Sequence, residues 1–256
     1  MTVAAFTRMR FAPAIVGFGS LLLSILAFEI MIRAGLLNRF IVPLPSEIGA
    51  AFERVILEEQ IIERFFLTLK ECVSAAILLA IFGISIGTLL YKVDILRRAT
   101  ETWVAAAASA PTVLMYPLFL VIFGRSATTI VMMGFVAGLP AVILKTIEGL
   151  SGTKRVLINV GRSFKLTPWQ MFWKIQFPSA LPTIFTGFKL GLIFALINVV
   201  GVEFLINFGG IGQLINDLAE RYDLPGTYAA ICFVILVSVC FFIVVEWFER
   251  WLTRAD

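Results

Sequence analysis

Long apolar segments separated by shorter polar ones run along the whole chain. A helix that crosses a bilayer needs about 20 mostly apolar residues, and the sequence holds six segments of this kind. They lie at about residues 13–32, 68–91, 103–123, 127–145, 181–205 and 228–247. The pattern predicts a single all-α integral membrane domain over residues 1–256 with six transmembrane helices.

The composition supports this interpretation of the pattern. Of the residues, 60% are hydrophobic and 15% are charged, whereas an ordinary soluble domain has about 25% charged residues. A soluble fold of 256 residues could not bury so many apolar side chains. The first segment follows Arg8 and Arg10, so a cleaved signal peptide is its alternative. Its length and the lack of a small-x-small cleavage site favour a span.

The charged residues are distributed unevenly among the connections between the predicted spans. Basic residues prevail before the first span, in residues 92–101 and above all in residues 145–174, whereas residues 33–64 and 203–223 are net acidic. Because basic loops stay on the cytoplasmic side, we expect both termini and the second and fourth connections to be cytoplasmic. The short third connection, with Arg125, departs from this rule.

The first connection carries the pattern of an amphipathic helix. Ser46 is a suitable N-cap, and Pro45 holds the residue before it extended. Apolar residues then follow at helical spacing: Ile48, Ala51, Phe52 and Val55. We predict a helix at the external membrane face, with two alternatives open for its apolar side, namely binding to lipid and packing on the bundle.

The fourth connection, at about residues 146–180, is too polar to span the bilayer and too long for a turn. Thr167, Pro168 and Gln170 occupy the N-cap, first and third positions of a capping box. We therefore predict a short helix that starts at Thr167. It should end before Phe177-Pro178, because the residue before proline avoids the α region.

A second short helix is predicted ahead of this one, over residues 154–164. The large apolar side chains of the two helices are Val156, Leu157, Val160, Phe164, Trp169, Phe172 and Trp173. Exposed Trp and Phe are typical of interface anchors, so one hypothesis is a docking surface for another protein. The alternative is that these side chains pack on the ends of the chain's own spans.

Several kinds of chemistry are excluded by residues that the sequence lacks. It has no histidine, which removes His-ligated metals, His general bases and Ser-His or Cys-His triads. Cys72, Cys232 and Cys240 form no CxxC and are interpreted as small core residues. No GxxxxGK(S/T) loop is present. Residues 209–212 do not match GxGxxG, so we expect a turn there that leads into a short helix over residues 213–221.

The fourth connection also has the spacing of a known motif. Asn159-Val160-Gly161, Lys165, Ile175 and Phe177-Pro178 lie at the spacing of the EAA loop, which marks the permease subunits of ATP-binding-cassette importers. The chain resembles these subunits over about residues 40–250. Four further stretches resemble the branch that imports nitrate, sulfonates, taurine and related molecules: residues 42–47, 123–124, 202–203 and 223–226.

The motif departs from the family pattern at two places. Asn159-Val160-Gly161 replaces the acidic-Ala-Ala start, and Lys165 replaces the loop glycine. Glycine would allow a left-handed turn there without steric cost, whereas lysine is unfavourable in that region. Two sources for the bend are therefore open: flexibility at Gly161, or the start of the helix at Thr167-Pro168.

The resemblance implies the type I importer permease fold, with an external amphipathic helix and a cytoplasmic loop of coupling helices. An external binding protein, periplasmic or lipid-anchored, would deliver a small solute such as nitrate, a sulfonate or taurine. Two partner ATPase subunits, with ATP and Mg, would drive alternating access through this chain and a second permease subunit, identical or different. The chain itself would be no enzyme and hold no cofactor, and it would lie in the bacterial inner membrane. A pyrimidine vitamin precursor or riboflavin is the alternative solute.

On this resemblance and the helix prediction together, one set of residues is expected to couple the chain to the ATPase. The set is Asn159, Val160, Gly161, Phe164, Lys165, Thr167, Pro168, Trp169, Phe172, Trp173, Ile175 and Pro178. No residue of the set is expected to be catalytic or to bind a metal.

Polar groups in the third and fifth spans indicate a candidate translocation pathway, because intramembrane polar residues are often functional. Prolines in the third span free backbone carbonyls, which are tolerated where they face protein or a water-filled cavity. The expected lining is Ser109, Thr112, Met115, Tyr116, Asn198 and Glu203. For Glu203, capping the end of the bundle is the alternative. Lys189 is expected to reach the lipid headgroups.

Two other function classes fit the residues less well. An ATP-independent secondary transporter often carries internal repeats with paired broken helices, and none is found in this sequence. An integral-membrane enzyme would need clustered titratable residues at membrane depth, where this sequence has isolated carboxylates.

Overall fold

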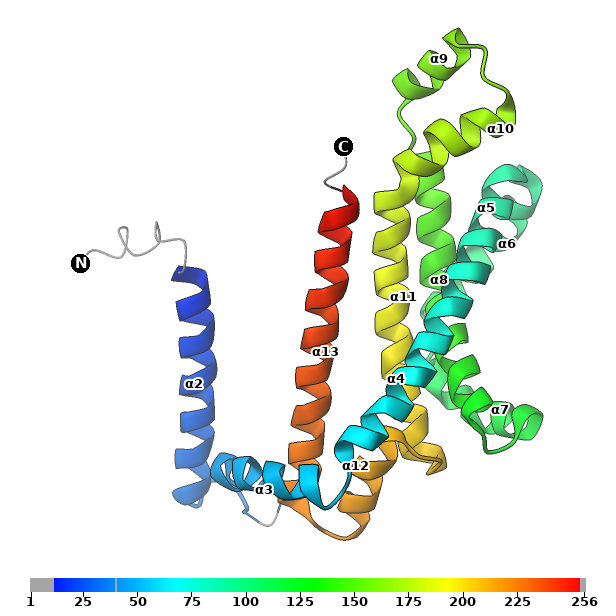
Figure 1. Ribbon diagram of the computed structural model, residues 1–256. Helices are drawn as coiled ribbons and strands as arrows, with labels where there is room; N and C mark the ends of the chain where they lie inside the picture. Colours follow the sequence, from blue (N-terminus) through cyan, green and yellow to red (C-terminus); the bar gives the residue numbers. More distant parts are fainter. Residues whose placement is uncertain (1–11, 40, 254–256) are drawn as a thin grey trace. The chain divides into compact units, whose positions relative to one another are not determined.

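The computed structural model describes residues 12–39 and 41–253 (Figure 1). All regular elements of this part of the chain are helical: α2 (Ala12–Arg33), α3 (Pro45–Leu57), α4 (Ile61–Leu78), η1 (Leu79–Gly83), α5 (Ile84–Lys92), α6 (Asp94–Ala108), η2 (Thr112–Met115), α7 (Tyr116–Phe123), α8 (Ala127–Ser151), α9 (Arg155–Ser163), α10 (Pro168–Met171), η3 (Phe172–Gln176), α11 (Phe177–Ile206), α12 (Gly210–Glu220) and α13 (Leu224–Thr253). The chain forms two compact units, Met1–Ile61 with Asp217–Phe233 and Ile62–Asn216 with Val234–Asp256.

Within the described residues, five helical stretches are long and apolar enough to cross a membrane. They are Ile15–Arg33, Ile61–Lys92, Ala127–Ser151, Pro168–Ile206 and Leu224–Trp247. A sixth crossing is made if the bent pair Asp94–Ala108 and Thr112–Phe123 passes as one segment. The prediction of an all-α membrane fold is confirmed, and most of the helices are longer than the spans predicted from hydropathy.

The third apolar segment is a broken helix and not one regular span. Its two parts meet at an angle of 94°, because α6 ends at Ala108 and η2 begins at Thr112. Pro111 lies between them; it has no N–H to donate and holds the residue before it out of the α region. Pro111 therefore marks a complete break in the helix at this point.

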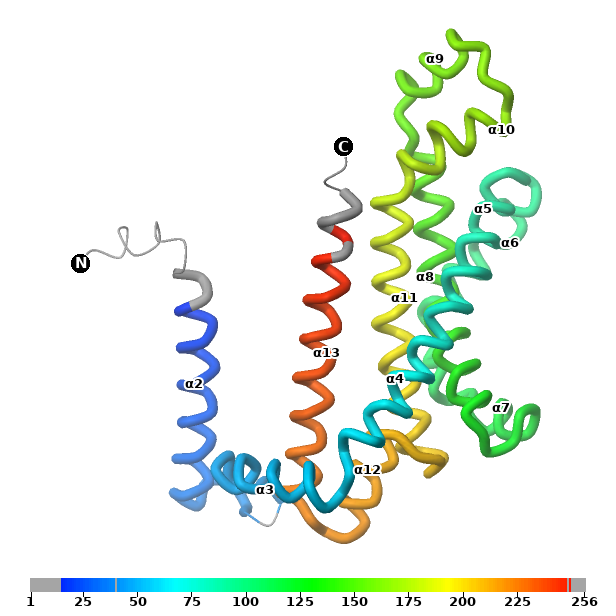
Figure 2. The backbone as a smooth tube through the Cα atoms, in the orientation of Figure 1, coloured from blue at the N-terminus to red at the C-terminus, as the bar shows by residue number. Residues whose placement is uncertain are grey.

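The second unit is built on α8 and α11, which lie side by side and antiparallel (Figure 2). Small residues face each other where the two helices meet. A Cβ atom at Gly138 would lie 2.4 Å from the backbone oxygen of Gly191, and one at Gly149 would lie 3.1 Å from that of Ala180. Small residues let helix backbones approach closely, which is how helices gain van der Waals packing inside a membrane.

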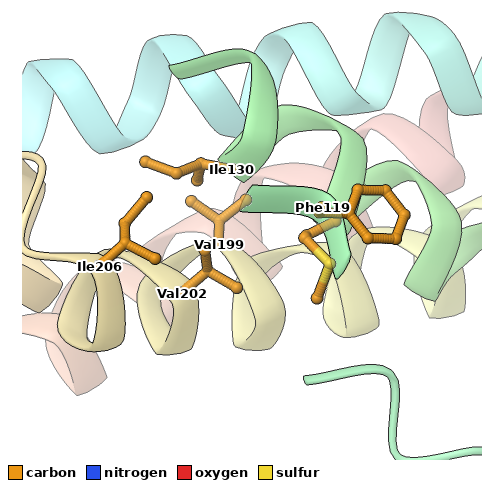
Figure 3. Close-up of a cluster of buried hydrophobic side chains, with 6 residues drawn as sticks. Phe119, Ile130, Val199, Val202 and Ile206 are labelled. Carbon is orange, nitrogen blue, oxygen red and sulfur yellow. The ribbon is translucent and has the colours of Figure 1, made fainter. Parts of the chain in front are cut away.

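Apolar clusters attach the neighbouring helices to this pair. One cluster holds Phe119, Ile130, Met133, Val199, Val202 and Ile206 (Figure 3). Cys72 of α4 and Tyr116 of α7 pack against it. A second cluster around Leu79 and Leu192 is covered by Phe241 of α13. Helices α4, α7 and α13 thus share one core with α8 and α11.

In the first unit, α2 leads into α3 through polar contacts. Glu29 lies 2.7 Å from Arg33, one turn away, and accepts hydrogen bonds from the backbone N–H and side-chain hydroxyl of Ser46, at 3.2 and 3.0 Å. The predicted helix is present, but its N-cap is Leu44 and not Ser46. The reason is that the Ser46 hydroxyl binds Glu29, while the Leu44 N–H donates to the Glu47 carboxylate at 3.1 Å.

Two ion pairs hold α3 in place within this unit. Arg54 Nη2 lies 2.5 Å from Asp223 Oδ2, and this hydrogen bond raises the pKa of Arg54. A hydrogen bond from Arg39 lowers the pKa of the Glu47 carboxyl. Because exposed ion pairs contribute about 1 kcal/mol or less, we infer that these contacts orient α3 more than they stabilise the fold.

Candidate functional site

The connection between α8 and α11 forms the first candidate site, and it begins as the sequence predicts. Helix α9 spans Arg155–Ser163, within the predicted range 154–164. Helix α10 begins at Pro168 after Thr167, whose hydroxyl accepts the Gln170 N–H at 3.3 Å. The Gln170 side chain in turn accepts the Thr167 N–H at 3.1 Å. The predicted capping box is confirmed.

The end of the second short helix is not where proline predicts it. The chain continues from α10 through the π-helical turn η3 into α11, without a break at Phe177-Pro178. Pro178 lies in the first turn of α11, where a missing N–H is tolerated, and a π turn shifts the hydrogen-bond pattern ahead of it. The prediction of a helix end at Phe177 is wrong, and α10 is continuous with a long membrane helix.

Lys165 and Gly161, the two unusual residues of the motif, have different roles between α9 and α10. Lys165 has φ of 51°, in the left-handed region where the family pattern has glycine. Gly161 lies inside α9, where a Cβ atom would come within 2.7 Å of Met171 and 2.6 Å of Ile175. Gly161 therefore permits close packing of α9 on η3, and the bend is made at Lys165.

The apolar side chains of this connection divide into an outward and an inward group. Phe164 is 76% exposed and Trp169 is 66% exposed; Val156, Val160 and Trp173 are exposed as well. Phe172 faces inward and is 5% exposed, packed with Leu150, Ala180 and Ile184. Of the other predicted coupling residues, Asn159, Lys165, Thr167, Pro168 and Pro178 are exposed, and Ile175 is half-buried.

Two residues at the end of α5, which are not among the predicted coupling residues, support the aromatic group. Lys92 Nζ lies 4.3 Å from the ring centroid of Phe172 and 5.8 Å from that of Trp169, which are cation–π distances. Gln176 donates a hydrogen bond to the Tyr91 hydroxyl at 3.0 Å. The adjacent Tyr91-Lys92 at the end of a span was the available signal.

The second candidate site lies where η2 meets α11. Thr112 donates a hydrogen bond to Asn198 Oδ1 at 2.9 Å, and Asn198 Nδ2 donates to the carbonyl of Phe194 at 3.0 Å. The structure thus brings together two of the predicted pathway residues across the break in the third segment. Ser109 and Met115 are exposed nearby in sequence, and Tyr116 is half-buried against the core.

Glu203, which was also predicted to line the pathway, does not reach an open surface in this structure. Its side chain is fully buried and accepts hydrogen bonds from Thr68 at 2.7 Å and from the Gly212 N–H at 2.9 Å. The structure supports the alternative, that this carboxylate caps the end of the bundle. Lys189 likewise pairs with Glu249 of α13 at 3.4 Å, and does not extend alone toward the headgroups.

The cysteines and acidic residues offer no metal centre in the described part of the chain. Cys72, Cys232 and Cys240 are all free thiols, and Cys240 is exposed, which corrects the prediction of a core residue. Among residues 12–39 and 41–253, no group of three or more Cys, Asp or Glu residues is placed to hold a metal ion.

Comparison with known sequences gives consistent matches. The family described as the inner-membrane component of binding-protein-dependent transport systems matches residues 79–254. The riboflavin transport system permease protein RibX of Chloroflexus aurantiacus is 27% identical over 62% of this chain and 59% of its own length. The formylaminopyrimidine transport permease protein ThiX of Halalkalibacterium halodurans is 24% identical over 81% of this chain and 83% of its own. The nitrate import permease protein NrtB of Synechocystis sp. is 26% identical over 62% and 58%. The chain thus spans less than two thirds of RibX and NrtB.

Comparison with solved structures finds the same architecture. The inward-facing methionine ABC transporter MetNI matches with a TM-score of 0.66, covering 75% of this chain and 95% of that one. The sequence identity is 19%, so this likeness shows the fold alone.

Proposed function

The chain belongs to the family of inner-membrane components of binding-protein-dependent transport systems, and on that premise we propose that it is the transmembrane permease subunit of an ATP-binding-cassette importer. In this role it carries a small solute, delivered by an external binding protein, across the bacterial inner membrane. Separate ATPase subunits hydrolyse ATP with Mg²⁺, and a second permease, of the same or another sequence, completes the pathway.

The observation that carries this proposal is the exposed aromatic surface of α9 and α10. Phe164 and Trp169 project from a connection rich in basic residues, and the Trp169 ring is contacted by Lys92 Nζ and by the ring of Trp173. Leaving large aromatic side chains in water is unfavourable, so a partner that covers them gains free energy. Basic loops of membrane proteins face the cytoplasm, so the charge of this connection supports docking of an ATPase subunit there.

The same connection passes motion to the membrane helices. Because α10 continues through η3 into α11, a displacement at Trp169 moves α11 without a flexible loop between them. Helix α11 carries Asn198, which holds Thr112 at the break of the third segment. Tilting α11 therefore changes the contact between these two polar residues, which suits a pathway that opens to alternate sides of the membrane.

Two classes of solute are supported by the named relatives. A nitrate permease and permeases for riboflavin and a formylaminopyrimidine are of similar identity to this chain, between 24% and 27%. We propose a small anion of the nitrate, sulfonate or taurine type as the first candidate, and a vitamin or vitamin precursor with a heteroaromatic ring as the second. The Thr112–Asn198 pair offers hydrogen-bonding groups to either class.

The docking role is tested by the double variant Phe164→Ala, Trp169→Ala. Both side chains are exposed, so the membrane bundle should stay folded while the ATPase no longer co-purifies with the permease. The matched control is Trp247→Ala, an exposed tryptophan on α13, which should retain the ATPase. Normal recovery of the ATPase with the double variant would refute the docking assignment.

Energy coupling and solute are tested together by reconstitution of the whole complex into vesicles. Uptake of labelled nitrate, taurine, riboflavin or a formylaminopyrimidine is measured with and without ATP, in the presence of the binding protein. Uptake should require ATP and the ATPase subunits. Uptake that persists without both would instead support an ATP-independent secondary transporter.

A further inference from the structure

A carboxyl group with no use in the proposed transport cycle is buried in the second unit. Glu71 of α4 is 3% exposed, and neither of its side-chain oxygens has a hydrogen-bond partner in the described part of the chain. An ionised carboxylate that is buried without donors is strongly destabilising, and such a group usually takes up a proton instead. The surroundings of Glu71 therefore favour the neutral acid.

The group that Glu71 faces is the carboxylate of Glu203 on α11. Glu203 is fully buried, and both of its oxygens accept hydrogen bonds, one from the Thr68 hydroxyl at 2.7 Å and one from the Gly212 N–H at 2.9 Å. The Thr68 oxygen also accepts the Ile211 N–H at 3.0 Å. Because these N–H groups belong to the first turn of α12, where negative charge is stabilised, Glu203 is the member of the pair that is held as an anion.

The fit around Glu203 leaves no room for a larger ligand. A Cβ atom at Gly210 would lie 2.0 Å from the Glu203 carboxylate, and one at Gly212 would lie 2.6 Å from the Glu203 Cβ atom. Gly210 also has φ of 76°, which favours glycine. A divalent cation requires about six oxygen ligands, whereas the oxygens of Glu203 are already engaged. A proton is the cation that fits.

The other titratable groups on the helices packed here do not replace that proton. Cys72 lies beside Glu71 on α4. Cys72 and Tyr116 of α7 both pack against the apolar cluster around Phe119 and Val199 that Figure 3 shows. Arg125 donates to the backbone oxygen of Asn207, outside the pair. Helix α8 has no titratable side chain before Lys145, and residues 210–216 of α12 have none. Lys70 of α4 is exposed, and Arg64 is half-buried one turn before Thr68 and two turns before Glu71.

We propose that Glu71 and Glu203 share a single proton, carried by Glu71 and donated to Glu203, and that this proton fastens the start of α12 to α4 and α11. With the proton in place, Glu71 gives Glu203 a further hydrogen-bond donor besides Thr68 and Gly212, and the pair carries one negative charge at a helix N-terminus. Without it, two negative charges face each other away from water. The folded state therefore binds a proton that the unfolded chain releases at neutral pH, so its stability falls as the pH rises.

Infrared spectroscopy of the full-length chain, reconstituted in lipid at neutral pH, tests the protonation directly. The wild type should show the C=O stretch of a protonated carboxylic acid, and Glu71→Gln should remove it. The control Glu148→Gln, at an exposed residue paired with Lys145, should keep the band. A wild type without the band, or a band that is unchanged in Glu71→Gln, would overturn the proposal.

Thermal unfolding of the same preparations tests the consequence for α12. Glutamine keeps the shape and the hydrogen-bond donor of a protonated Glu71, so Glu71→Gln should retain the wild-type Tm at neutral pH. Between neutral and alkaline pH, its Tm should fall less than the Tm of the wild type. An equal alkaline loss in both proteins would contradict the shared proton. The titration is repeated with a chelator and with added Ca²⁺; a Tm that depends on either would mean that a metal ion, not a proton, joins the two carboxyl groups.

Discussion

At one end of the α8–α11 pair, Phe164 and Trp169 are 76% and 66% exposed on α9 and α10. At the other end, α12 begins over Glu203, whose charged side chain is fully buried. The first end keeps apolar groups in water and the second keeps polar groups out of it, and each choice costs free energy in the isolated chain. In the proposed complex a partner protein would offset the first cost, and hydrogen bonds within the fold offset the second.

Because one end exposes apolar side chains and the other buries a carboxylate, the two ends should respond differently to mutation. Changes at the exposed end should alter binding while the bundle stays folded. Changes at the buried end should alter the free energy of unfolding whether or not a partner is present.

The largest effect should come from removing the support that both ends share. Gly191→Leu places a large side chain where a Cβ atom would already lie 2.7 Å from Val142. Overpacking of this kind costs about 3 kcal/mol, so both ends should lose their structure together. The measurement is denaturant unfolding in detergent, with Gly201→Leu as control, because a Cβ atom at Gly201 has its nearest contact at 3.5 Å. Equal stability of the two variants would contradict the close packing of α8 on α11.

The next effect is confined to the buried end. Glu203→Ala leaves the Thr68 hydroxyl and the Gly212 N–H without their acceptor, which costs about 1–3 kcal/mol. Unfolding in detergent should show this loss, while binding of the ATPase to the folded fraction is unchanged. If the two ends are independent, the amount of bound ATPase should fall only as far as the amount of folded permease falls.

A smaller effect is expected at the exposed end from the helix cap. Thr167→Ala removes the hydroxyl that accepts the Gln170 N–H, and loss of such an N-cap costs about 1 kcal/mol. Hydrogen exchange in residues 168–171 should quicken, while exchange in α12 stays as in the wild type. Ser163→Ala is the control, because that hydroxyl bonds only to its own helix at Asn159. Faster exchange in α12 would show that the ends are not independent.

The smallest effect should be a gain in stability. Lys165→Gly places the residue favoured by left-handed backbone at a position whose φ is 51°, and relief of this strain is expected to outweigh the extra freedom of the unfolded chain by about 0.5 kcal/mol. The Tm of the purified chain should rise slightly, and the affinity for the ATPase should be equal or higher. A lower Tm would mean that the lysine side chain makes a contact that matters more than its backbone.

Much of the exposed end could be predicted from the sequence because its signals are local. The capping box at Thr167 and the apolar spacing of α9 depend on residues a few positions apart, and both were confirmed. The end of the second helix was predicted wrongly, because the effect of Pro178 depends on the π turn ahead of it. Which aromatics face inward could not be read either, since the burial of Phe172 depends on Leu150 and Ile184 from other helices.

The buried end was much harder to predict, because its contacts join residues far apart in the chain. Thr68 and Glu203 are separated by 135 positions, and Ile211 and Thr68 by 143. The glycines at 209–212 were correctly interpreted as a turn into a short helix, which starts at Gly210. Their second property, close approach to a carboxylate, has no local signal in the sequence.

Helix α10, the π turn η3 and α11 form one continuous helical path in the second unit. Helix α11 alone has 30 residues, which at about 1.5 Å per residue is roughly 45 Å, longer than the hydrocarbon core of about 30 Å. Trp169 lies in α10 at one end of this helical path, and Glu203 lies in α11 near the other end. A displacement at Trp169 would therefore be passed along one helical path to the far side of the bilayer, through the π turn η3 and past Pro182 inside α11.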